Sequence, residues 1–297
     1  MKEFDINKGS VEPLTIALGF FDCLHIGHKR LVSEAIDMSY DTAQAALFTF
    51  RNNPFALLCS DTKPVYNYEE RKHTLLGLGV HNIVFADFDK EFMAMTKDAF
   101  LKRLDAFNLK GIVCGYDYSF GKGGYGKPQD MKLYAESRGI AFSCIAPVKI
   151  IGERVSSTNI RKYLKEGDIT SVNRLLGEKW LLSGEVIKGD GIGRTIGLPT
   201  ANLKIDESEK LLCADGVYSG ETEIENKKYN CLIHIGMRPT LDKLERRVEV
   251  HIKDFSKDLY GKILYIRITN RIRGIEKFND VNELKAQILK DMNGIND

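Results

Sequence analysis

Two histidines, His25 and His28, lie three residues apart in a turn that begins at Gly19. An apolar run precedes this turn, and a segment with a helical pattern follows it. Histidines at this spacing face one way at a helix start, where unpaired N–H groups and the positive end of the helix dipole favour phosphate. We therefore predict a nucleotide site in this turn. The alternative is two surface histidines in a loop.

A second region suited to phosphate is the glycine-rich segment 189–202. Its four glycines within nine residues permit close approach of the backbone to phosphates, and Arg194 adds a fixed positive charge. Thr200 and Asn202 supply hard oxygen ligands, which Mg²⁺ accepts beside phosphate. The alternative is a glycine-rich hairpin loop with one exposed arginine.

A third candidate is the segment 156–161, where Ser and Thr residues precede a helical pattern. A Ser or Thr cap satisfies the first N–H groups of a helix. Arg161 lies within the first turns of the expected helix. The segment therefore predicts another helix start that suits phosphate.

The elements that position the two histidines alternate between short apolar runs and helical patterns. The apolar runs read as buried parallel strands, and they cover residues 14–20, 45–50, 83–88, 111–114 and 140–146. The helical patterns cover residues 28–38, 68–78, 97–108 and 129–138. Gly79 and Gly139 fall where two of these helices should end. This alternation predicts a parallel α/β sheet, whose ligands bind beyond the carboxyl ends of the strands.

The pattern changes after Trp180, where polar and apolar residues begin to alternate. The expected strands cover residues 181–187, 216–224, 228–235, 248–252 and 263–268. Short strands separated by turns predict an antiparallel sheet or barrel. A final helix over residues 278–292 should pack on it through Leu284, Ile288 and Leu289. We place the domains at residues 1–180 and 181–297.

Composition excludes several classes of protein. The net charge of +2 gives no argument for binding nucleic acid or an anionic membrane. No apolar run approaches the ~20 residues of a membrane helix, and the N-terminus lacks a signal-peptide pattern. None of the six cysteines has metal-binding spacing, so we expect free thiols and a cytoplasmic location. The sequence does not indicate an oligomeric state.

The first two phosphate-binding candidates carry motifs that resemble known families. The motif Gly-x-Phe-Asp-x-x-His-x-Gly-His over residues 19–28 resembles the signature of the nucleotidylyltransferase superfamily, which leaves the acceptor open. The motif Gly-x-Gly-Arg-x-x-Gly-x-Pro-Thr-Ala-Asn over residues 191–202 resembles the flavokinase signature at every fixed position. Further flavokinase matches cover nearly all of residues 183–292. In this order, the two modules resemble the prokaryotic bifunctional riboflavin kinase/FAD synthetases.

The resemblance implies a fold and two reactions. The fold is an α/β Rossmann-like nucleotidylyltransferase domain followed by an antiparallel β-barrel flavokinase domain with a C-terminal helix. ATP would phosphorylate riboflavin to FMN, and a second ATP would adenylylate FMN to give FAD and pyrophosphate. Both reactions would require Mg²⁺. The partners would be the small molecules riboflavin, FMN and ATP.

For the kinase reaction, the resemblance implies that Glu249 is the catalytic base, in the motif Glu-x-His-Ile. Alternation along the strand would point Glu249 away from the face of Val248 and Val250. Thr200 and Asn202 would hold Mg²⁺ and phosphate. The other residues implied in ATP binding here are Gly191, Gly193, Arg194, Gly197 and Pro199.

For adenylyl transfer, the resemblance implies that His25, His28 and Arg161 steady the triphosphate. The other residues implied in ATP binding in this domain are Gly19, Phe20, Phe21, Asp22, Gly27, Ser156, Ser157 and Thr158. The residues that match a flavin-side loop, Gly-x-Asp-x-x-Phe-Gly, are Asp117, Phe120 and Gly121.

The first module departs from its family pattern at Cys23, Asn53 and Gly124, which replace Gly, His and Arg. If the position of Cys23 requires a positive φ, the substitution costs about 1 kcal/mol or more. One alternative is therefore a riboflavin kinase whose N-terminal domain is a weak or inactive adenylyltransferase that serves as a flavin- and ATP-binding regulatory module. Another is an adenylyltransferase for a different phosphorylated acceptor.

Overall fold

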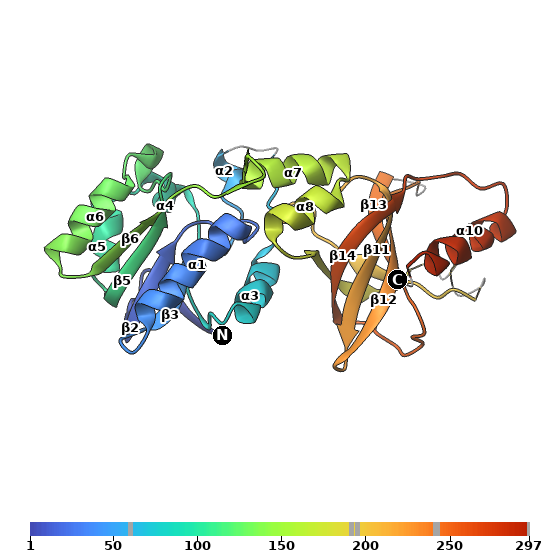
Figure 1. Cartoon of the computed structure of the whole chain (residues 1–297), viewed down its shortest axis with the longest axis horizontal. Helices are drawn as coiled ribbons and strands as arrows, with labels where there is room; N and C mark the ends of the chain where they lie inside the picture. The colour runs from blue at the N-terminus through green and yellow to red at the C-terminus, as the bar shows by residue number, and fades with distance from the viewer. Residues whose placement is uncertain (59–61, 190–192, 194–196, 240–243, 296–297) are drawn as a thin grey trace. The chain divides into compact units, whose positions relative to one another are not determined.

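The computed structural model describes residues 1–58, 62–189, 193, 197–239 and 244–295. The chain divides into two compact units, Met1–Ser157 and Thr158–Asp297, which Figure 1 colours from blue to green and from yellow-green to red. The division falls upstream of residue 180, where we expected the domain boundary. The functional boundary between the two domains therefore stays a prediction. None of the helices in the described residues is long and apolar enough to cross a membrane.

The first unit is built on a parallel six-stranded sheet in the order β1-β4-β3-β2-β5-β6. Its strands are β1 (Lys2–Asp5), β2 (Ser10–Leu18), β3 (Gln44–Phe50), β4 (Asn82–Ala86), β5 (Phe107–Gly115) and β6 (Ala141–Ile145). The five expected strands are confirmed. β1 was not predicted, because this short strand at the edge of the sheet lacks an apolar run and pairs only with β4.

The strand order places the loops expected to bind ATP and flavin beside each other. β3 and β4 lie on one side of β2, and β5 and β6 on the other, so the order reverses between β2 and β5. Ligands of open α/β sheets bind at such a reversal, beyond the carboxyl ends of the strands. The histidine turn follows β2 and the loop with Asp117 follows β5, so both leave the same edge of the sheet.

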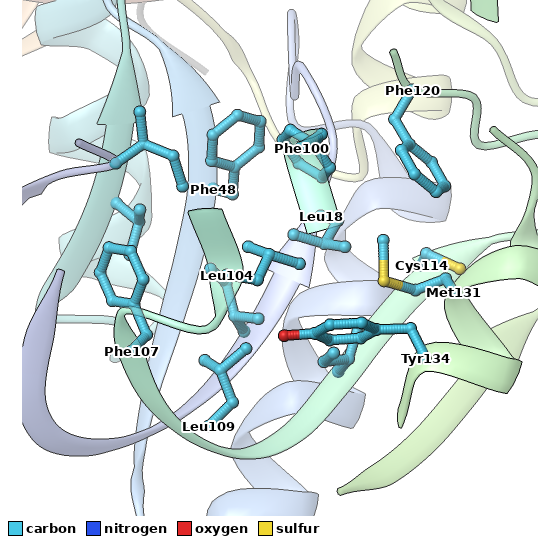
Figure 2. Packing of buried hydrophobic residues seen from close by; sticks show 14 of the residues in the cluster. Leu18, Phe48, Phe100, Leu104, Phe107, Leu109, Cys114, Phe120, Met131 and Tyr134 are labelled. Carbon is cyan, nitrogen blue, oxygen red and sulfur yellow. The ribbon is translucent and has the colours of Figure 1, made fainter. Parts of the chain in front are cut away.

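Helices cover both faces of this sheet. They are α1 (Ile26–Ser39), α2 (Phe55–Leu58), α3 (Tyr68–Gly77), α4 (Lys90–Ala94), α5 (Lys97–Leu104) and α6 (Pro128–Ser137). Alternate strand residues feed two cores: Leu47 packs with residues of α1 and α3, whereas Phe48 packs with residues of α5 and α6. Figure 2 shows the second core, in which Phe48 and Phe100 meet with ring centroids 5.6 Å apart. Gly79 and Gly139 follow α3 and α6 with positive φ, as expected of residues that end helices.

The second unit contains a closed antiparallel barrel. Its strands, in the order β10-β13-β12-β11-β14-β9, are β9 (Trp180–Ile187), β10 (Ala201–Lys204), β11 (Gly216–Ile224), β12 (Lys227–Pro239), β13 (Leu244–Ile252) and β14 (Ile263–Arg273). The helices are α7 (Ser157–Glu166), which begins at the last residue of the first unit, α8 (Ile169–Leu176) and α10 (Val281–Asn293). The predicted fold class is confirmed for both domains.

The final helix packs on the outside of the barrel through one narrow side. Met292 and Ile288 of α10 contact Val217 and Leu232 of the barrel strands. Leu289, which we expected on the same side, is 44% exposed, so that expectation was wrong. The next residue along a helix is turned by about 100°, and this rotation carries Leu289 away from the contact made by Ile288.

Candidate functional sites

A cavity of about 770 Å³ opens in the first unit at the carboxyl ends of the strands. The predicted site residues that line it are Gly19, Phe20, Phe21, His25, Gly27, His28, Asp117, Phe120, Gly121, Ser156 and Ser157. The fold therefore joins three segments that are far apart in the sequence. The residues predicted for the phosphate side and those predicted for the flavin side therefore line one and the same cavity.

The two histidines form a stacked pair at the start of α1. Their ring centroids are 3.7 Å apart, and the rings are within 11° of parallel. His25 is the N-cap of α1, and its Nδ1 accepts a hydrogen bond of 3.0 Å from the backbone N–H of His28. The proton of a neutral His25 ring is therefore on Nε2, which can donate to an oxygen.

Both histidines are neutral at physiological pH. Burial lowers the pKa of His25 to about 4. Burial, with a smaller contribution from His25, also lowers the pKa of His28 well below its usual range. Nδ1 of His28 is buried without a hydrogen-bond partner among the described residues. The pair can thus supply neutral N–H donors to phosphate rather than positive charges.

In the turn that carries the histidines, two residues near Cys23 have positive φ values, whereas Cys23 itself does not. Phe21 and Leu24 have φ values of 55° and 46°, whereas Cys23 is absent from the described residues with positive φ. The condition for strain at Cys23 is therefore not met. Cys23 is fully buried, with its Sγ 3.3 Å from Oγ of Ser157. Gly27 fits its position because an added Cβ would lie 3.0 Å from the His25 ring.

Asp22 has a structural contact, and its expected role in ATP binding stays a prediction. It is buried, does not line the cavity, and its Oδ1 accepts a hydrogen bond of 2.8 Å from the backbone N–H of Val65. The contact fixes the turn against the segment that leads to α3. Thr158 and Arg161 belong to α7 in the second unit, and their role in ATP binding stays a prediction.

Cys23, His25 and His28 also form the kind of group that can hold a metal ion, because their ligand atoms all lie within 4.8 Å of one another. Two features oppose a shared ion. The rings are nearly parallel, so their lone pairs do not converge on one point. The cap hydrogen bond already uses Nδ1 of His25. The arrangement suits donors to phosphate oxygens better than ligands of one metal ion.

The wall attributed to the flavin is aromatic. The aromatic residues that line the cavity are Phe20, Phe21, Phe48, Phe50, Phe55, Phe88, Phe92, Phe100, Tyr116, Tyr118 and Phe120. Phe120 is 6% exposed, and its ring is stacked on Tyr118 with centroids 5.8 Å apart. At Gly121, where φ is 72°, an added Cβ would lie 2.6 Å from the backbone nitrogen of Lys97. A flat apolar ring system has matching surfaces here.

Sequence reasoning missed two arginines at this site. Arg154 lines the cavity and forms an ion pair with Asp117, in which Nη2 and Oδ2 are 2.7 Å apart. Arg71 is buried and donates to the backbone oxygens of Phe20 and Phe50, so it ties the ends of β2 and β3 together. Arg154 could have been noticed two residues before Ser156, whereas nothing near Arg71 in the sequence marks its role.

In the second unit, the predicted kinase residues meet on the outer face of the barrel. Glu249 is directly opposite Asn202 in the pairing of β13 with β10, and cross-strand partners share a face. Oγ1 of Thr200 donates to Oε2 of Glu249 over 3.5 Å. The neighbours Val248 and Val250 are buried, so Glu249 points away from the barrel core as expected.

The glycine-rich segment is described only in part, because Gly191 and Arg194 lie outside the described residues. An added Cβ at Gly193 would run into the backbone oxygen of Leu198, and Gly197 has a φ of 80°, so both positions require glycine. The backbone oxygen of Pro199 lies 2.9 Å from Nδ1 of His251. This contact holds the residue just before Thr200 on the strand that carries Glu249.

His234 is a further residue that sequence reasoning missed. It is the partner of Glu249 on β12, on the side opposite β10. Asn202, Glu249 and His234 therefore form a row across three strands on one face. The row combines a carboxylate, which can accept a proton and bind Mg²⁺, with an amide oxygen, which can bind Mg²⁺, and an imidazole, which can accept a proton.

The chain is similar to known proteins along its whole length. A family model for FAD synthetase matches residues 8–159, and one for riboflavin kinase matches residues 176–297. A bifunctional riboflavin kinase/FMN adenylyltransferase of Listeria monocytogenes is 34% identical over 97% of this chain and 91% of its own. An enzyme of the same name from Bacillus subtilis is 32% identical over 93% of this chain and 89% of its own. A crystal structure from Streptococcus pneumoniae, described as a macrolide-efflux protein, is 32% identical with a TM-score of 0.85 and covers 99% of this chain and 98% of its own.

Proposed function

The chain belongs to the family of bifunctional riboflavin kinase/FMN adenylyltransferases, and from this premise we propose how its two units divide the work. The enzyme phosphorylates riboflavin with ATP to give FMN, and it adenylylates FMN with ATP to give FAD and pyrophosphate. We assign adenylyl transfer to the cavity of the first unit. We assign phosphorylation to the outer face of the barrel.

In the first unit, a phosphate oxygen of FMN attacks the α-phosphorus of ATP, and the bond to pyrophosphate breaks. FMN phosphate is an anion at neutral pH, so the attack requires no base. N–H donors of His25 and His28 stabilise the negative charge that develops on the triphosphate. The observation that carries this assignment is the stacked, neutral histidine pair at the start of α1, inside a cavity with an aromatic wall.

In the second unit, the ribityl 5′-hydroxyl of riboflavin attacks the γ-phosphorus of ATP, and the bond to ADP breaks. A hydroxyl must lose its proton, so this reaction benefits from a base. Glu249 takes the proton. Its carboxylate supports this role because it stands on the outer face beside Thr200 and Asn202 instead of in the core.

Mg²⁺ fits the donor set of the second unit. Thr200 and Asn202 offer hard oxygen ligands beside the Glu249 carboxylate, and Mg²⁺ there would neutralise charge on the transferred phosphate. The first unit offers a poorer donor set, because Asp117 is the only carboxylate among the described residues that line the cavity. We infer that Mg²⁺ enters the first site on the phosphates of ATP.

We also propose a cytoplasmic location and small-molecule partners only. No disulfide joins the five cysteines in the described part of the chain, which agrees with a reducing compartment. Riboflavin, FMN and ATP account for both sites without a macromolecular partner.

A product assay tests the proposed function. The full chain is incubated with riboflavin, ATP and Mg²⁺, and the flavins are separated by chromatography while pyrophosphate is measured. We expect FMN first, then FAD with one pyrophosphate for each FAD. FMN without FAD, together with retained binding of FMN and ATP, would support the regulatory-module alternative. FAD absent while another phosphorylated acceptor is adenylylated would support a different acceptor.

A further inference from the structure

The cavity of the first unit contains very little fixed charge. Among the described residues that line it, Arg154 is the only lysine or arginine and Asp117 is the only acid. His25 and His28 add no charge, because burial keeps both neutral at physiological pH. The positions of Asn53 and Gly124, where the family resemblance leads one to expect a histidine and an arginine, are also uncharged. Arg154 is therefore the one cationic side chain that the described lining of this cavity offers to two anionic substrates.

Arg154 stands between the two groups of predicted site residues. It ends the short strand β8 (Glu153–Arg154), two residues before Ser156 on the ATP side. Its guanidinium pairs with Asp117 on the flavin side and lies 5.2 Å from the ring centroid of Tyr116. The charges of Arg154 and Asp117 both act on His25, in opposite directions. Arg154 is thus close to both the histidine pair and the flavin-side loop.

The ion pair between Arg154 and Asp117 is weakly held. The two side chains are 53% and 59% exposed, and Nη2 of Arg154 lies 2.7 Å from Oδ2 of Asp117. Exposed pairs of this kind contribute little to stability, because water screens them. A phosphate offers a guanidinium two or three acceptor oxygens and a larger negative charge, so it competes well with one carboxylate.

Adenylyl transfer brings two anions into contact, since the FMN phosphate must approach the triphosphate of ATP. We propose that Arg154 joins them: its guanidinium leaves Asp117 when substrates bind and bridges the phosphate of FMN to the triphosphate of ATP, while Asp117 acts as a substitute anion in the empty cavity. This inference rests on the proposed function of the first unit. It adds a phosphate-binding residue and a competing carboxylate to that function.

The proposal makes opposite predictions for the two members of the pair. Arg154→Gln removes a charge-assisted contact to phosphate, so we expect kcat/KM for FMN to fall about 10- to 100-fold, with a fall of the same sign for ATP. Arg154→Lys should recover part of the loss, because it keeps the charge without the planar fork. Asp117→Asn removes the competitor, so we expect a severalfold lower KM for FMN. A pair that only braced the loop would give losses in both variants.

The molecule supplies a matched control. Arg138 and Asp105 of the same unit form another exposed ion pair, with Nε 2.7 Å from Oδ1 and Nη2 3.1 Å from Oδ2, and neither residue lines the cavity. Arg138→Gln should leave adenylyl transfer unchanged. Riboflavin phosphorylation by the same preparations is the internal control, and it should be unchanged in all variants.

The outcomes separate the proposal from the function on which it rests. If the unaltered chain makes no FAD, the proposed function fails, and calorimetric titration with FMN still tests Arg154. In that titration, Arg154→Gln should weaken binding about tenfold relative to Arg138→Gln. Equal FMN kinetics and equal FMN binding in Arg154→Gln and Arg138→Gln would overturn the proposal. A higher KM for FMN in Asp117→Asn would overturn the competition, and an effect on ATP alone would overturn the bridge.

Discussion

The two units of the enzyme present different side chains at the sites that we propose for ATP. In the α/β unit, a buried and neutral histidine pair faces a cavity, and the carboxylate that lines it is paired with an arginine. On the barrel, a carboxylate stands on the outer face beside a threonine and an asparagine. The difference follows from the nucleophiles. The FMN phosphate is already an anion, so its attack requires N–H donors that stabilise the triphosphate. The riboflavin hydroxyl must lose a proton, so its attack requires a base.

The largest expected effect is the loss of the kinase reaction that we assign to the barrel. Glu249→Gln keeps the shape of the side chain but removes the group that accepts the proton. We expect the rate of FMN formation to fall about 10²- to 10⁴-fold. The measurement is chromatography of products from riboflavin, ATP and Mg²⁺. A rate within threefold of the unaltered chain would show that Glu249 is not the base.

The next largest effect is the loss of the adenylyl transfer that we assign to the α/β unit. His25→Asn retains a side chain that can cap α1, because asparagine is a favoured N-cap residue. It loses the imidazole donor, so we expect FAD formation from FMN to fall about 10²- to 10³-fold while the kinase rate is unchanged. Circular dichroism checks that the fold is intact. Adenylyl transfer at the original rate would remove His25 from the mechanism.

The buried histidines also predict how stability depends on pH. The pKa of His25 is about 4 in the folded chain and near 6.5 when unfolded, so the unfolded state binds the extra proton. This contribution is fully present above pH 6.5 and is lost as the pH falls toward 4. For His25 the loss is of order 3 kcal/mol as an upper limit, and His28 acts in the same direction.

Urea unfolding at several pH values, followed by circular dichroism, measures this dependence. His25→Asn should reduce it, whereas His81→Asn, a change at an exposed histidine of the same unit, should not. Trp180 is the single tryptophan and belongs to the barrel unit, so its fluorescence should show a weaker pH dependence. A pH dependence that is the same in both histidine variants would contradict the assignment.

The smallest effect concerns Cys23. Because this position does not take a positive φ, restoring glycine relieves no strain. We expect Cys23→Gly to lower the free energy of unfolding by about 1 kcal/mol, through added freedom of the unfolded chain and lost packing, with no gain in adenylyl transfer. Gly27→Ala is the contrasting change, since its Cβ would press on the His25 ring, and it should slow adenylyl transfer. Faster FAD formation by Cys23→Gly would contradict this view.

The sequence was sufficient to predict the architecture and many of the residues that the fold brings together. Long apolar runs and glycines after helices predicted the strands and helix ends, because those signals are local. β1 and β10 were missed because each has four residues and depends on its partner strands. The contact of the Asp22 carboxylate with the backbone N–H of Val65 was not foreseen, because its motif position does not reveal a partner 43 residues away. Arg154 and His234 were missed because their neighbours in the fold are distant in the sequence.

If the two reactions have separate sites with different chemical needs, a change at one site leaves the other reaction intact. The most direct test supplies FMN and ATP to Glu249→Gln and measures the rate of FAD formation. We expect an FAD rate equal to that of the unaltered chain, in a variant whose formation of FMN from riboflavin has fallen about 10²- to 10⁴-fold. Loss of both activities together, or retention of both, would contradict it.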